Sequence, residues 1–99
     1  MDEPEREIVY SDDADRDIEE IAEHLQAAAG FDVAERYLGD IVRSISGLQD
    51  NPSLGQQADR VKRDLRRLVC RNHMIYYRVR EAVEIVRILD TRRDHARLL

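Results

Sequence analysis

Apolar positions at helical spacing run through the first third of the chain. Within residues 12–29 they form one narrow stripe along an otherwise polar segment, made of Ile18, Ile21, Ala22 and Leu25. Ser11 precedes this segment as a suitable N-cap, and aspartates fill its first turn, where the helix dipole favours negative charge. Gly30 follows as a natural stop. The pattern predicts a short strand over residues 7–10 and then an amphipathic helix that ends at Gly30.

A second, wider apolar stripe predicts another helix directly after the first. We expect it to begin at Asp32, which stands three residues before Glu35 in a capping-box arrangement. Pro52 should end it, because the residue before a proline is pushed out of the helical region. The stripe comprises Ala34, Tyr37, Leu38, Ile41, Val42, Ile45 and Leu48. The two segments form a helical hairpin, and a polar connection over residues 53–64, with a short helical turn around residues 57–62, should follow it.

The last forty residues change to the alternating pattern of strands. Three short runs, residues 66–69, 74–79 and 83–89, are separated by turn-forming positions. In the middle run Tyr76 and Tyr77 point to opposite faces. Strict alternation places four residues of the last run on one face, Val83, Ile85, Arg87 and Leu89. We therefore expect an α+β fold, with an N-terminal strand and an α-helical hairpin packed on a small antiparallel β-sheet whose other face is open to a partner.

Composition limits the class of protein. Ninety-nine residues, 42% hydrophobic and 37% charged, are expected to form one domain over residues 1–99. No apolar stretch approaches the roughly 18 residues of a membrane span, and the acidic residues 1–7 lack the apolar core of a secretory signal. The single cysteine, Cys70, suits a reducing compartment. We therefore expect a cytoplasmic protein.

The net charge of −5 is divided unevenly along the chain. Residues 1–60 hold sixteen Asp or Glu against five Lys or Arg, whereas residues 61–99 hold eleven Lys or Arg against five Asp or Glu. This asymmetry predicts a basic face on the sheet and tail, which would attract an acidic peptide, an acidic protein surface or a phosphate backbone. Pairing of the acidic helices with the basic strands inside the fold is the alternative.

Motifs for metal binding, cofactor binding and hydrolysis are incomplete. Three aspartates at alternate positions in residues 13–17 have the spacing of an EF-hand opening, but Ile18 stands where the loop needs glycine. Glu20 and His24, four residues apart, would form half of a metal site, and no second pair exists at ligand spacing. The chain has no glycine-rich phosphate loop and no nucleophile elbow. We expect no cofactor and no catalytic residue.

Basic residues cluster near two tyrosines in the last forty residues. Cations beside aromatic rings on a sheet can hold RNA through stacking and phosphate contacts. Metal-free RNA cleavage also needs a placed acid and base, and none stands out here. A solvated rim of arginines around core tyrosines is the alternative. The cluster consists of Lys62, Arg63, Arg66, Arg67, Arg71, Arg78, Arg87, Arg92, Arg93 and Arg97, interleaved with Tyr76 and Tyr77.

The order of these elements resembles the toxins of the RelE/ParE superfamily, and most of all the ParE toxins of type II toxin–antitoxin systems. The resemblance covers residues 8–99. Besides the helical hairpin, it is carried by Pro52-Ser53-Leu54-Gly55, by the strand with Tyr77-Arg78-Val79 and by the tail Arg92-Arg93-Asp94. The chain departs from the family at Asp90-Thr91, where a histidine or a glycine-containing sequence often precedes the tail.

The RelE-type ribosome-dependent nucleases differ from this chain at positions that matter for chemistry. Aligned with them without gaps, the chain has Val69 where they have an arginine and Leu99 where they have a tyrosine, and it keeps only the arginine at Arg93. These nucleases also tend to be strongly basic, whereas this chain is acidic overall. The resemblance therefore implies a ParE-like toxin that acts by binding and is not an enzyme.

A ParE-like identity would imply particular partners. ParE toxins are understood to poison DNA gyrase and block replication, and a small ParD-like antitoxin neutralises them with an acidic, amphipathic C-terminal segment. Operator DNA would be contacted only through the antitoxin, and no membrane or small-molecule substrate is implied. On this pattern we expect two sets of residues: Arg67, Tyr77, Arg78 and Arg87 for antitoxin binding, and Arg92, Arg93 and Asp94 for toxicity and target binding.

Two other functions remain open from the sequence alone. A RelE-type mRNA endonuclease with a rearranged site would use Arg93 as the cation and Tyr76 or His95 as the acid or base. A non-toxic interaction module derived from the same fold would keep only its partner surface. An upstream reading frame for a DNA-binding fold with an acidic tail would favour either toxin without separating the two.

Overall fold

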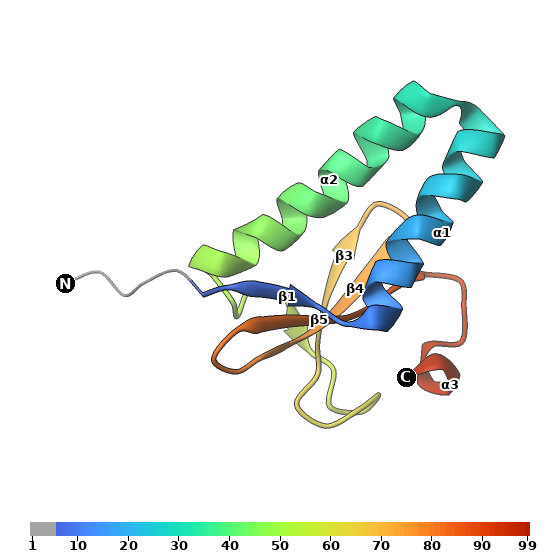
Figure 1. Cartoon of the computed structure of the whole chain (residues 1–99). Helices are drawn as coiled ribbons and strands as arrows, with labels where there is room; N and C mark the ends of the chain where they lie inside the picture. Colours follow the sequence, from blue (N-terminus) through green and yellow to red (C-terminus); the bar gives the residue numbers. More distant parts are fainter. Residues whose placement is uncertain (1–5) are drawn as a thin grey trace.

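The computed structural model describes residues 6–99, so most of the acidic N-terminal segment that bears on a secretory signal lies outside the described residues. The expected α+β arrangement is confirmed, with a helical hairpin lying along one face of a sheet (Figure 1). In chain order the elements are β1 (Ile8–Tyr10), α1 (Asp12–Ala29), α2 (Phe31–Asp50), β2 (Gln56–Gln57), β3 (Arg66–Cys70), β4 (His73–Val79), β5 (Val83–Asp90) and α3 (His95–Leu98).

The helical hairpin forms largely from local signals. The Ser11 side chain accepts a hydrogen bond from the Ala14 N–H at 2.9 Å, as an N-cap does, and donates one to the Val86 carbonyl, which ties α1 to β5. Gly30, with φ 91°, ends α1 and at once precedes α2. The predicted capping box at Asp32 is wrong, because α2 starts one residue earlier, after Gly30, and has no side-chain cap.

The sheet is mixed, with strand order β1-β5-β4-β3-β2. The meander β3-β4-β5 is antiparallel as expected, and the N-terminal strand β1 pairs with β5 in parallel, which makes the sheet as a whole mixed. β2 is an unexpected strand, since Gln56 and Gln57 pair with Arg67 and Arg66. The helical turn predicted around residues 57–62 begins one residue later, because Gln57 belongs to β2: the Ala58 carbonyl accepts from the Val61 N–H at 3.0 Å and from the Lys62 N–H at 3.2 Å.

A β-bulge breaks the alternation of β5. Tyr76 pairs with Arg87, but its neighbour Tyr77 pairs with Ile85, which leaves Val86 as an extra residue on β5. Ile85 and Ile88 consequently both belong to the core under the hairpin, whereas strict alternation had placed them on opposite faces. The prediction that Arg87 and Leu89 lie on the same face of the sheet as Ile85 is therefore wrong, because the bulge reverses the alternation.

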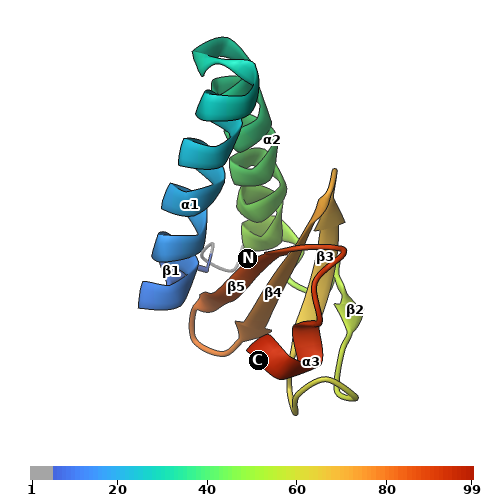
Figure 2. The same cartoon turned by 90° about the vertical axis from the view of Figure 1, so that its right-hand side faces the viewer.

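Both faces of the sheet carry an apolar core. The larger core fills the space between the hairpin and the sheet and includes Ile41, Ile45, Tyr77 and Ile85. A smaller core on the opposite face contains Ala58, Leu65, Tyr76 and Leu89, with Val61, Met74, Val86, Leu98 and Leu99 packed against it. That face, expected to be open, is partly covered by the loop before β3 and by α3 (Figure 2).

Candidate partner-binding site

A groove of about 440 Å³ lies between α1 and the end of the sheet where β4 begins and β5 ends. We call it the α1 groove. One wall belongs to α1, and the other belongs to β4, β5 and the segment that follows them. The groove is lined by Asp17, Glu20, Ile21, His24, Leu25, His73, Ile88, Leu89, Asp90, Arg92 and Arg93.

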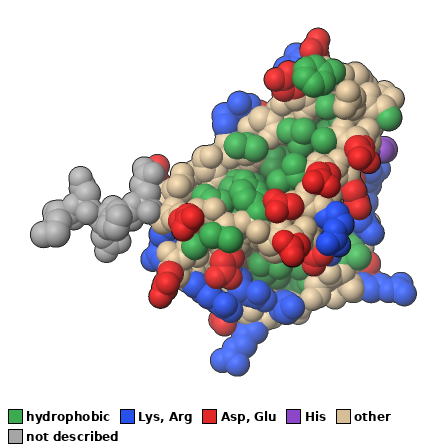
Figure 3. All heavy atoms as spheres, in the orientation of Figure 1, with side chains coloured by type: hydrophobic (Ala, Val, Ile, Leu, Met, Phe, Trp, Pro, Cys, Tyr) green, Lys and Arg blue, Asp and Glu red, His purple; other side chains and the backbone are tan. Residues whose placement is uncertain are grey.

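The α1 groove is amphipathic. Ile21, Leu25 and Ile88 give it an apolar lining, while Arg92 and Arg93 are exposed at its rim. In the view of Figure 3, Asp and Glu flank the apolar residues of the hairpin, and most of the visible Lys and Arg lie along the lower part of the molecule. Such a groove suits a segment that buries an apolar side and carries carboxylates beside it.

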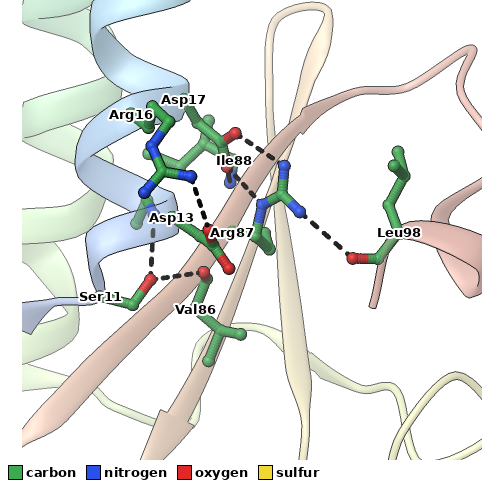
Figure 4. A network of polar contacts seen from close by, with 9 residues as sticks. Ser11, Asp13, Arg16, Asp17, Val86, Arg87, Ile88 and Leu98 are labelled. Atoms are coloured by element: carbon green, nitrogen blue, oxygen red, sulfur yellow. Dashed lines mark hydrogen bonds and ion pairs between the residues drawn. The ribbon is translucent and has the colours of Figure 1, made fainter.

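Asp17 and Arg87 form a bidentate ion pair beside this groove (Figure 4). The Arg87 Nε and Nη2 atoms donate to the two Asp17 carboxylate oxygens at 2.8 Å each, and the Ile88 N–H donates to the same carboxylate at 2.9 Å. Arg87 Nη1 donates to the Leu98 carbonyl at 3.2 Å. The hydrogen bond with Asp17 raises the pKa of Arg87. Asp17 is buried, so Arg87 is held by the fold and is not a free cation on a binding surface.

A second polar cluster fixes the start of β4. The Tyr37 hydroxyl accepts a hydrogen bond from the Asn72 N–H at 3.1 Å and lies 2.6 Å from Nδ1 of His73. Burial lowers the pKa of His73, which favours the neutral ring, and a neutral ring can accept a hydrogen bond from the Tyr37 hydroxyl at Nδ1. The hairpin and the groove wall at His73 are thereby locked together.

The tail residues predicted for toxicity are all exposed. Arg92 bonds back to the Asp90 carboxylate through Nε and Nη2, and this contact holds the pKa of Asp90 well below its usual range. The Arg93 amide donates to the Asp90 carbonyl at 3.1 Å, and the Arg93 side chain is exposed. Asp94 stands just before α3 and makes no side-chain cap. Arg93 therefore presents its guanidinium group beside the groove, whereas the guanidinium group of Arg92 is paired with Asp90.

The residues predicted for antitoxin binding are not brought together. Tyr77 is fully buried, and its hydroxyl donates to the Pro52 carbonyl and accepts from the Gly55 N–H, both at 2.8 Å. Arg78 is half-buried opposite Glu84 of β5. Arg67 is exposed on β3, on the far side of the sheet from the α1 groove. Tyr77 and Arg87 thus hold the fold, and only Arg67 and Arg78 remain accessible.

A second hollow, of about 400 Å³, lies along β3. We call it the β3 groove. Its lining is mostly apolar, and Arg67 is its one charged residue within the described part of the chain. The lining residues are Leu54, Gly55, Gln56, Arg67, Leu68, Val69 and Met74.

Tyr76 and His95 form a pair that bears on the nuclease alternative. The Tyr76 hydroxyl lies 2.6 Å from Nδ1 of His95, and His95 Nε2 lies 2.7 Å from the Asp90 carbonyl oxygen. Since a carbonyl only accepts, Nε2 carries the ring hydrogen and Nδ1 accepts from Tyr76. Tyr76 is 1% exposed, so both groups serve to dock α3 on the sheet.

Sequence reasoning missed the α1 wall of the groove and the partner of Arg87. Asp17 lies between Ala14 and Ile21 at helical spacing, so an aspartate inside the buried stripe was the available signal. Nothing in the sequence indicated which cation it meets. Within residues 6–99 no group of three His, Cys, Asp or Glu is arranged to hold a metal ion. In the same range no helix has the length and apolar character needed to cross a membrane.

The fold and the grooves define a small α+β domain with two hollows beside its sheet. Among known protein families, the one described as the ParE toxin of type II toxin-antitoxin system, parDE, matches residues 8–95 of the chain. The chain belongs to this family of toxins.

Individual relatives agree with that assignment. Toxin ParE1 of Mycobacterium tuberculosis is 32% identical over 79 residues, which cover 78% of this chain and 81% of the relative. Toxin ParE1 of Caulobacter vibrioides is 28% identical over 76 residues, 77% of this chain and 79% of that protein. A solved structure described as the chromosomal ParDE TA system from P. aeruginosa superposes with a TM-score of 0.76 at 22% identity, covering 86% of this chain and 95% of that one, and confirms the fold.

Proposed function

We propose that this ParE toxin is neutralised by a ParD-like antitoxin whose acidic, amphipathic segment lies in the α1 groove. The observation that carries the proposal is the combination of apolar Ile21, Leu25 and Ile88 with the exposed guanidinium groups of Arg92 and Arg93 in one groove. An acidic helix or strand would bury its apolar side there and pair its carboxylates with the rim. The P. aeruginosa relative, described as a ParDE system, has the same fold.

Free toxin, in this proposal, acts by binding DNA gyrase in the cytoplasm and blocking replication, without catalysis of its own. Arg92, Arg93 and Asp94 are the target-binding residues, because they are exposed and hold no part of the core. Two of them also line the α1 groove, so a bound antitoxin would cover them. Operator DNA would be reached only through the antitoxin.

The antitoxin contacts predicted from the sequence divide into two roles in this proposal. Arg78 and Arg67 are the accessible cations that would meet carboxylates outside the groove. Tyr77 and Arg87 act indirectly, because they hold the loop after α2 and the wall of the groove in place.

No specific observation favours the RelE-type nuclease. Its acid or base would have to be Tyr76 or His95, which bond to each other and pack α3 against the sheet. A general acid or base must reach the proton that it transfers, and Tyr76 is buried.

Controlled expression in a bacterial host, with and without the upstream-encoded partner, tests the proposal. DNA and protein synthesis are scored separately. Filamentation, a DNA-damage response and early loss of DNA synthesis, all suppressed by the partner, are the expected result. Prompt loss of translation with codon-positioned mRNA cuts would contradict gyrase binding, and absence of arrest would leave a non-toxic interaction module.

A further inference from the structure

Four charged side chains at the α1 groove are paired with one another. Asp17 of α1 is held by Arg87 of β5, and Asp90 at the end of β5 is held by Arg92. Each of these pairs cancels most of its own charge. Neither pair therefore supplies much attraction for an incoming partner.

Two opposite charges that line the same groove have no such counter-charge. Within residues 6–99 neither Glu20 nor Arg93 forms an ion pair, and both residues are exposed. Glu20 belongs to α1, whereas Arg93 belongs to the segment that follows β5, so the two residues stand on different walls. The groove is therefore negative on its α1 wall and positive on the wall that carries Arg93.

The apolar lining of the groove decides how an amphipathic segment can meet these two charges. Such a segment turns its apolar side toward Ile21, Leu25 and Ile88. The residues on the two flanks of that apolar side then face the two walls, one toward Glu20 and the other toward Arg93. A segment with carboxylates on both flanks would be attracted by Arg93 and repelled by Glu20.

We infer that the α1 groove selects a segment with opposite charges on its two flanks, a Lys or Arg facing Glu20 and a carboxylate facing Arg93. This inference rests on the proposed function for the identity of the partner, the antitoxin. It adds that the bound segment is not acidic all round.

The two unpaired charges also fix the direction in which the segment runs. Reversing the segment end to end, with its apolar side kept in the groove, exchanges its two flanks. The cation would then face Arg93 and the carboxylate would face Glu20. Like charges would meet at both walls, so the reversed direction is disfavoured.

Charge reversal at Glu20 tests the inference, because the two kinds of segment predict opposite signs. The affinity of the antitoxin encoded beside this chain is measured for the wild-type toxin, for Glu20→Lys and for Glu19→Lys. Glu19→Lys is the matched control, since Glu19 is the neighbouring exposed residue of α1, lies outside the groove lining and undergoes the same change of charge. We expect Glu20→Lys to bind at least about fivefold more weakly than Glu19→Lys. A segment that is acidic on both flanks would instead bind Glu20→Lys more tightly.

Compensating changes in the antitoxin identify the facing cation. Each Lys or Arg of its toxin-binding segment is replaced by Glu in turn, and the affinity is measured for wild-type toxin and for Glu20→Lys. At the position that faces Glu20, the altered antitoxin should bind Glu20→Lys more tightly than it binds the wild-type toxin. Urea unfolding should show that both toxin variants keep their stability, because both side chains are exposed.

The outcomes separate the inference from the proposed function. If the complex forms but Glu20→Lys binds as well as Glu19→Lys or better, the inference is wrong and the proposed function stands. The inference is also wrong if Glu20→Lys binds weakly but no replacement in the antitoxin compensates. If the wild-type chain forms no complex, both are overturned.

Discussion

Asp17 and Arg87, 70 positions apart in the chain, close a bidentate ion pair that joins α1 to β5, and through Leu98 to the C-terminal helix. The pair is largely withdrawn from water, with side-chain exposures of 7% and 18%. Two of the three joined elements, α1 and β5, line the α1 groove. The rim that carries Arg92 and Arg93 is thus connected to the hairpin by one guanidinium group.

Asp17→Asn should destabilise the fold strongly. It leaves the half-buried Arg87 without its counter-charge, and breaking a pair so far withdrawn from water costs about 3 kcal/mol. Urea unfolding followed by circular dichroism measures the loss. Asp13→Asn is the control, because its pair with Arg16 is exposed on the same helix and contributes about 0.5 kcal/mol or less. Equal losses for the two variants would show that the buried pair adds nothing beyond a surface pair.

Gly55→Ala and Gly47→Ala should change stability in opposite directions. A Cβ at Gly55 would lie 2.6 Å from the Arg67 carbonyl oxygen and from the Tyr77 hydroxyl. The loop after α2 would have to move away from Tyr77, at a cost of about 2 kcal/mol. At Gly47, inside α2, a Cβ meets nothing within 4 Å, so alanine should add about 0.5–1 kcal/mol through helix propensity. Thermal unfolding of both variants checks the two signs, and a stable Gly55→Ala would contradict the close approach.

Some of this architecture was predictable because its causes are local. Ser11 and Gly30 mark the limits of α1 through capping and through a positive φ, and both depend on a few neighbouring residues. The assignment of Tyr76 and Tyr77 to opposite faces of β4 follows from the period of a strand and is confirmed. The capping box at Asp32 failed because Gly30 serves both helices and leaves no residue between them to act as a side-chain cap.

The features that sequence reasoning missed depend on pairing between distant segments. The bulge at Val86 arises from the register between β4 and β5, and it decides which residues of β5 face the hairpin. β2 exists only because Gln56 and Gln57 meet the edge of β3. Arg87 was predicted to bind the antitoxin because its ion-pair partner, Asp17, lies on another element and is distant in the sequence. The α1 wall of the candidate site was therefore not predicted, because it depends on how α1 packs against β5.

Stability should fall as the pH drops below the ordinary pKa of histidine, about 6.5. Burial lowers the pKa of His73 in the folded state. In this pH range the unfolded chain therefore binds more protons than the folded chain, and acid stabilises the unfolded state. The contribution of His73 is complete above pH 6.5 and declines as the pH falls toward its lowered pKa. Urea unfolding between pH 5 and 7.5 measures the slope.

His73→Gln should make the free energy of unfolding depend less on pH, since glutamine does not titrate. Its side-chain carbonyl can accept the hydrogen bond from the Tyr37 hydroxyl in place of Nδ1. His24→Gln is the control for replacing a histidine in the same groove, because His24 is exposed on α1. An unchanged slope in His73→Gln would assign the acid sensitivity to another group.

Arg93→Glu should weaken antitoxin binding without unfolding the toxin. The side chain is exposed at the rim of the α1 groove, and its reversal would repel an acidic segment that the wild-type residue attracts. We expect the association rate to fall about tenfold at low salt and the difference to shrink as salt screens the charges. Surface plasmon resonance at several ionic strengths measures this. Arg16→Glu, an exposed arginine of α1 outside the groove, should change the rate far less. If the two reversals act equally at every salt concentration, the antitoxin responds to the net charge of the toxin and not to the rim of the groove.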